Sequence, residues 1–217
     1  MKRSSSGLLN VFEDVCPLSE DTALVVTGVD YMHHTELREV RYYLVGEEVV
    51  VESSRLVREG THLRLGNVHH GTIVLSDAGR IEGARVAPVD GYVEQPFATD
   101  EGLFYTHGSE IWRDRSKLIP RFDGYDEICH PTVDGRWLYF EAKRVDPQFP
   151  GSAKDWQVLR YHLDSGEIEL ILVHGANPYV FEGRLFHSRW SDTKRGFETA
   201  AIPIPAALPE RGLRGAA

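Results

Sequence analysis

A short turn pair recurs along this chain, each time directly before an apolar segment. The pairs are Glu59-Gly60, Glu101-Gly102, Asp134-Gly135 and Glu182-Gly183, with Glu20-Asp21 in the same place ahead of residues 23–26. Successive pairs lie about 40 residues apart, the period of a propeller blade made of four short strands. One four-stranded sheet cannot bury both faces alone, so the copies must pack on one another. The spacing therefore predicts an all-β chain of five four-stranded sheets.

The clearest copy is the stretch from residue 128 to residue 172. Its apolar alternation predicts antiparallel strands at 128–133, 137–142, 156–163 and 167–172. Asp134-Gly135 is a strong tight-turn pair between the first two strands. A long polar, proline-containing loop at 143–156 separates the second strand from the third.

The remaining copies follow the same order along one domain, residues 1–205, with a tail at 206–217. The blades are predicted near 14–55, 56–91, 92–125, 126–175 and 176–205. The last blade shows three strand patterns, and the apolar residues 7–12 are the obvious fourth. We therefore predict a five-bladed β-propeller whose ring is closed by this N-terminal strand, which would remove exposed sheet edges. A loosely docked arm is the alternative for residues 7–12.

The segment His130-Pro131-Thr132-Val133-Asp134-Gly135-Arg136-Trp137-Leu138-Tyr139-Phe140 resembles the TolB-type, WD-like propeller repeat. The close match covers one blade, and Val133 stands where that repeat usually has serine. The resemblance implies blade geometry and no particular activity, because propellers have binding, scaffolding and hydrolytic roles.

Composition narrows the partners and the compartment. The net charge of −9 argues against a nonspecific nucleic-acid binder. No apolar run is long enough to cross a membrane, and residues 1–15 lack the apolar core of a signal peptide. Cys16 and Cys129 take equivalent places in non-adjacent blades, which predicts buried free thiols rather than a disulfide. A cytoplasmic location is the expectation; the oligomeric state is left open.

Propeller geometry sorts the connections into two ends. Short turns gather at one end, and the long loops, with their aromatic and histidine residues, gather at the other. Loops on a rigid scaffold are the usual place for binding sites. We therefore expect a ligand-binding site at the long-loop end, formed by Tyr125, Trp156, His174, Tyr179 and Trp190.

A few acids and histidines also suggest catalysis or metal binding. Asp14, Glu94 and Asp126 fall near the mouth of the predicted channel, where paired carboxylates could hydrolyse a glycan. His33-His34 and His69-His70 suggest metal ligands, but adjacent residues point opposite ways, so each pair should supply one ligand at most. No metal or cofactor is expected. The sequence favours a non-catalytic binding module or scaffold for a protein segment or a glycan, with a glycan-active hydrolase as the alternative.

Overall fold

The computed structural model describes residues 14–30, 34–145, 155–191 and 196–206, and every regular element in them but one residue is extended. The strands are β1 (Asp14–Pro17), β2 (Thr22–Asp30), β3 (His34–Val45), β4 (Glu48–Gly60), β5 (Arg64–His69), β6 (Thr72–Asp77), β7 (Arg80–Glu82), β8 (Glu94–Thr99), β9 (Gly102–Thr106), β10 (Ile111–Arg113), β11 (Ser116–Ile119), β12 (Tyr125–Asp134), β13 (Trp137–Arg144), β14 (Trp156–His162), β15 (Ile168–Val173), β16 (Ala176–Phe181), β17 (Arg184–Ser191) and β18 (Gly196–Pro203). The prediction of an all-β chain with antiparallel pairing is confirmed.

The strands form four antiparallel sheets, and three of these are built only from strands that follow one another in sequence. Three are β5-β6-β7, β8-β9-β10-β11 and β12-β13-β14-β15. The fourth sheet has seven strands and contains two runs of consecutive strands, β1–β4 and β16–β18. The two runs are joined through a single residue pair, Ala200 with Glu48. The amide of Ala201 donates to the Glu47 carbonyl at 2.8 Å at this junction.

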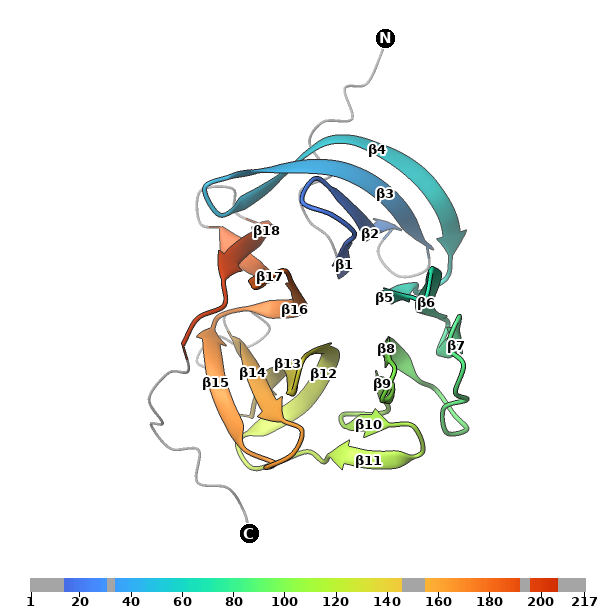
Figure 1. Cartoon of the computed structure of the whole chain (residues 1–217), viewed down its shortest axis with the longest axis vertical. Helices are drawn as coiled ribbons and strands as arrows, with labels where there is room; N and C mark the ends of the chain where they lie inside the picture. The colour runs from blue at the N-terminus through green and yellow to red at the C-terminus, as the bar shows by residue number, and fades with distance from the viewer. Residues whose placement is uncertain (1–13, 31–33, 146–154, 192–195, 207–217) are drawn as a thin grey trace.

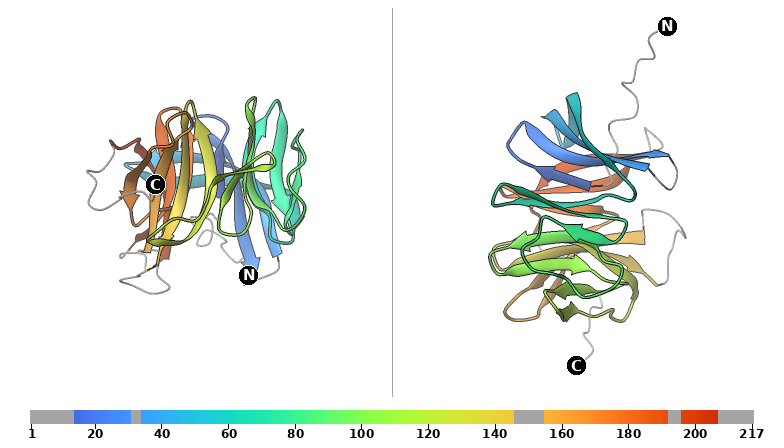
Figure 2. Two further views of the ribbon diagram at one scale, coloured as in Figure 1. Left: turned by 90° about the horizontal axis from the view of Figure 1, so that it is seen from below. Right: turned by 90° about the vertical axis from the view of Figure 1, so that its right-hand side faces the viewer.

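The sheets stand around a common centre (Figure 1). The first strand of each run, β1, β5, β8, β12 and β16, lies innermost, and later strands lie progressively outward. These inner strands contact their neighbours in the order β1, β5, β8, β12, β16 and back to β1. The left view of Figure 2 shows the strands running between two ends of the molecule. We call the end with the first-to-second strand connections the turn end, and the end with the second-to-third connections the loop end.

The boundary between the first two units differs from the prediction. Strand β4 continues through Gly60, so the boundary expected near residue 55 falls inside a strand. The turn between the first two strands of the next sheet is at His70-Gly71 rather than at Glu59-Gly60. Strand β4 continues past its charged residues because β3 pairs with β4 along its whole length. The sheet that follows has three strands among the described residues rather than four.

Most of the inner strands contain a bulge. Pairing with the second strand skips two residues in four of the five inner strands. In three of them the skipped pair is a residue at positive φ followed by proline. These pairs are Gln95-Pro96, His130-Pro131 and Asn177-Pro178. A bulge locally bends a strand and re-aims a side chain. Here it places the residue before each proline beside the common centre.

The core lies between the sheets rather than in one layer. Phe104, Phe140 and Ile128 are fully buried in the largest cluster, with Leu138 beside them. Tyr139 is buried and Trp137 is half-buried, with the Arg160 guanidinium 4.1 Å from the centre of its ring. Both cysteines are free and buried, as expected.

The predicted closing strand and the C-terminal tail lie mostly beyond the described residues. Residues 7–12, the proposed closing strand, lie outside the described residues, as does nearly all of the 206–217 tail. The last run has β18 as its outermost described strand, and β18 pairs with β4 at Ala200. No described helix is long and apolar enough to span a bilayer.

Candidate functional site

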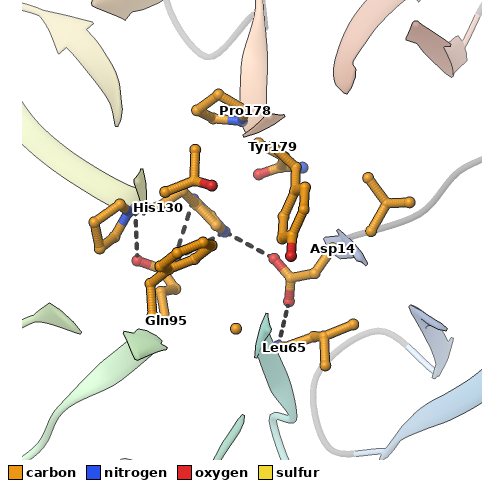
Figure 3. A pocket seen from close by; sticks show the side chains of 12 residues that line it. Asp14, Leu65, Gln95, His130, Pro178 and Tyr179 are labelled. Carbon is orange, nitrogen blue, oxygen red and sulfur yellow. Dashed lines mark hydrogen bonds and ion pairs between the residues drawn. The ribbon is translucent and has the colours of Figure 1, made fainter. Parts of the chain in front are cut away.

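Asp14 begins the innermost strand of the first run and is almost completely buried. Its two carboxylate oxygens have different partners. Oδ2 accepts from the backbone N–H of Leu65 on β5 at 3.0 Å, and Oδ1 lies 3.0 Å from Nε2 of His130 on β12. One carboxylate therefore links three sheets, as the close view of this region shows (Figure 3).

His130 lies between two carboxylates. Its second ring nitrogen, Nδ1, is 2.7 Å from Oε1 of Glu141 on β13. Glu141 is also buried, and it accepts hydrogen bonds from the Cys129 thiol at 2.9 Å and from the backbone N–H of Asn177 on β16. Gln95 on β8 accepts from the backbone N–H of His130 at 3.1 Å and from the Thr106 hydroxyl at 2.8 Å. We call Asp14, Gln95, His130 and Glu141 the central cluster.

Electrostatics fix the charge states within the cluster. Burial disfavours a charged imidazole, yet Glu141 and Asp14 raise the pKa of His130 to about 9. Burial likewise opposes ionisation of the two carboxyls, but hydrogen bonding and the positive charge of His130 lower the pKa of Asp14 and that of Glu141. A buried imidazolium between two carboxylates is favourable when the remaining lone pairs are also satisfied. Backbone N–H groups and a thiol satisfy them here.

A glycine limits the space at this centre. A Cβ atom on Gly66 would lie 1.7 Å from the Pro96 carbonyl oxygen, so the inner strand β5 has no side chain at this position. The cavity beside it has a volume of about 20 Å³, and its lining includes Asp14, Gln95 and His130 of the cluster together with Gly66 and Tyr179. That volume suits about one water molecule.

The three predicted carboxylates are not brought together. Asp14 lines the central cavity, but neither Glu94 nor Asp126 does. Glu94 accepts a hydrogen bond from the Tyr92 hydroxyl at 2.9 Å, and Asp126 is exposed at the start of β12. The expected channel mouth with paired acids therefore does not form from these residues.

The five predicted ligand-binding residues are likewise dispersed. Tyr125 is buried and donates to Gln157 at 2.7 Å, and the Tyr179 hydroxyl lies 3.1 Å from the Cys16 sulfur beside the central cavity. Trp156 is half-buried, with the Lys143 ammonium 5.8 Å from its ring centre. His174 and Trp190 are exposed. Trp156, His174 and Trp190 each lie near a loop-end connection and remain candidates at that end.

The paired histidines differ from expectation in two ways. His69-His70 is at the turn end, not at the loop end, because His70-Gly71 joins β5 to β6. The two rings also face the same way, with centres 4.0 Å apart, because His70 has a positive φ of 48°. Alternation of side chains holds for regular strands and fails in this turn. His33 lies outside the described residues.

The place of His130 at the common centre was not predicted from the sequence. His130 stands first in the segment that resembles the repeat, and Gln95 and Asn177 likewise stand directly before prolines. The recurring pattern of a polar residue before proline was the available signal. No sequence signal marks Glu141, because a single acid in an apolar strand is usually interpreted as a residue that faces solvent.

Comparison with known proteins leaves the family open. No family model and no curated protein matches the chain. Among solved structures, a puromycin-hydrolysing peptidase of Mycobacterium tuberculosis is similar with 14% identity and a TM-score of 0.41, over 94% of this chain and 35% of that one. A structure from work on two prolyl endopeptidases gives 15% identity and a TM-score of 0.28, over 91% of this chain and 27% of that one. The chain thus spans about a third of the first protein's length, and similarity at this level assigns no activity.

Proposed function

We propose that the chain is a five-bladed β-propeller that acts as a non-catalytic binding module or scaffold. The five runs β1–β4, β5–β7, β8–β11, β12–β15 and β16–β18 would be its blades, with residues 7–12 as the added strand of the last one. The inner strands contact one another in a closed order, which supports this interpretation. The TolB-type resemblance of one blade remains part of the proposal.

The observation that carries the functional part is the closed centre. Each charge of the central cluster has a partner within the cluster or on adjacent backbone, and the adjoining cavity holds about one water molecule. Catalysis on a polymer or metabolite needs an accessible pocket with convergent groups. A centre with full internal pairing instead supports a rigid scaffold whose ends bind partners.

The loop end is the proposed binding surface. Three second-to-third strand connections, β2 to β3, β13 to β14 and β17 to β18, start and finish at strand ends on this side of the molecule. Trp156 begins β14 after one of these connections, and Trp190 precedes another. Trp190 is 40% exposed, which leaves an aromatic surface for a protein segment or a glycan.

The test compares the two ends of the molecule. Trp190→Ala and Trp156→Ala are screened against a displayed peptide library and a glycan array, beside Asp164→Ala at the turn end. Asp164 is an exposed partner of Arg136, so its loss should leave the fold intact. We expect the tryptophan variants to lose roughly 2 kcal/mol or more of binding energy. Loss confined to Asp164→Ala, or an absence of ligands in both screens, would contradict the proposal.

The glycan-active hydrolase is the weaker candidate. Both oxygens of Asp14 are already engaged, and Glu94 and Asp126 lie outside the central cavity. Turnover of any polysaccharide that is abolished in Asp14→Asn, with the fold preserved, would favour hydrolysis instead.

A further inference from the structure

Two histidines and an aspartate from neighbouring sheets meet at the turn end. His69 ends β5, and His70 with Gly71 makes the turn into β6. Asp100 lies in the turn between β8 and β9. Nε2 of His70 is 2.8 Å from Oδ1 of Asp100, and Nε2 of His69 is 3.5 Å from the same oxygen.

This spacing is close to that of a metal-binding site. Zinc bonds to imidazole nitrogen and carboxylate oxygen are about 2.0–2.2 Å long, so tetrahedral ligand atoms stand roughly 3.3 Å apart. Here one ligand atom from each residue can be chosen so that all three lie within 4.8 Å of one another. Small side-chain rotations would let a cation replace the hydrogen bond between His70 and Asp100. The side chain of Asp100 is 80% exposed and that of His70 about half-exposed. A cation can therefore reach both residues from solvent without any rearrangement of the core.

Two other groups of metal-ligating side chains are less suitable. Cys129, His130 and Glu141 belong to the closed central cluster, where burial and Glu141 raise the pKa of the thiol well above its usual value. A metal there would need a thiolate and would displace the imidazolium. In the group of His34, Glu36 and Glu59, Glu36 already pairs with Arg38 at 2.6 Å.

An adjoining cavity provides room for a fourth ligand. It has a volume of about 150 Å³, and its lining includes His69, Asp100, Thr99 and Arg85. Catalytic and ligand-exchanging zinc sites have three protein ligands and one open position, whereas structural sites have four. Arg85 is the one basic residue other than histidine among the described residues of this lining, and its positive charge favours a small anion, such as a carboxylate, in the open position.

We propose that His69, His70 and Asp100 bind a divalent transition-metal ion, zinc foremost, with an open coordination position that faces this cavity and accepts water or a small anion. Two imidazoles and a carboxylate suit zinc and its transition-metal neighbours and disfavour magnesium and calcium, which prefer oxygen ligands. The site lies at the turn end, so it is independent of the binding surface proposed at the loop end.

Calorimetric titration of the full chain with Zn²⁺ tests the site. We expect one ion per chain, no comparable binding of Mg²⁺, and an affinity loss of at least about tenfold in His70→Ala and Asp100→Asn. His34→Ala, in the competing group, is the matched control and should bind as the parent does. Unchanged affinity in His70→Ala and Asp100→Asn, or loss in His34→Ala alone, would overturn the assignment.

Co²⁺ reports on the open position. The visible absorption of the Co²⁺-loaded chain should change when acetate is added, and this response should weaken in Arg85→Gln, whose side chain is exposed and tolerant of change. A Co²⁺ spectrum that ignores acetate would show that the coordination is closed and would overturn that part of the proposal. Melting curves without metal confirm that each variant folds.

Discussion

At the residue scale, the histidine between two carboxylates makes stability depend on pH. The pKa of His130 lies at about 9 in the folded chain against an ordinary value of 6.5. Its contribution is therefore complete below about pH 6.5 and is lost as pH rises through about 9. Asp14 and Glu141 have lowered pKa values, so their contributions are complete above their ordinary values of 3.8 and 4.5 and are lost in stronger acid.

We accordingly expect the free energy of unfolding to fall between pH 6.5 and pH 9. His130→Gln should cost about 3–5 kcal/mol near pH 6, because it leaves buried carboxylates without their cation. The same variant should also show a smaller decrease of the free energy of unfolding between pH 6.5 and pH 9. Chemical denaturation across this range measures both effects, and a slope that survives in the variant would assign it to another group.

His187 should act in the opposite direction. Burial, the largest effect, lowers its pKa to about 4. Its unfolded form gains a proton below about pH 6.5 while its folded form does not, so stability is lost as pH falls toward 4, by up to about 3 kcal/mol. We expect His187→Leu to lose less stability than the parent on acidification from pH 6.5 to pH 4. Parallel curves for the two proteins would contradict this expectation.

Two glycines offer a matched test of crowding at the centre. Gly66→Ala should be severely destabilising, because the new Cβ would meet the Pro96 carbonyl at 1.7 Å. Gly135→Ala, in an exposed turn with φ of 59° and no atom near the new Cβ, should cost only about 1 kcal/mol. Melting temperatures decide the comparison; similar losses would mean that β5 and β8 can move apart freely.

At the scale of the element, strand prediction succeeded where turns and alternation agreed. The strands expected at 128–133, 137–142, 156–163 and 167–172 correspond closely to β12–β15. It failed around residue 60, where Glu59-Gly60 has the composition of a turn but ends a long strand paired to β3. Pairing along β3 outweighs the local turn preference, and no window of single-sequence pattern contains that information.

The site was harder to predict than the strands. Asp14 was singled out as a candidate acid on its position near the centre, whereas its role in the structure is to pair with His130. The convergence of Gln95, His130 and Asn177 depends on bulges in three separate sheets. A bulge changes which side a residue faces without changing the apolar pattern around it, so alternation alone could not place these side chains.

At the scale of the whole molecule, ring closure by residues 7–12 is still a prediction. Deleting residues 1–12 should lower the melting temperature clearly if they pair with the last run, because an edge would be opened. Deleting residues 206–217 should change little, because that segment has no strand pattern. Differential scanning calorimetry compares the two truncations, and equal small losses would make the N-terminal segment an accessory arm.

The central cluster also bears on how the chain reaches its fold. Asp14 lies near one end of the sequence, but its partner His130 and the Asn177 amide that binds Glu141 follow more than half a chain later. During synthesis, the first sheets would therefore emerge with a carboxylate whose counter-charge does not yet exist. Contacts of such long sequence separation slow folding and tie the early sheets to the late ones. Although it is built from repeats, the chain should fold in a single step near completion rather than sheet by sheet on the ribosome.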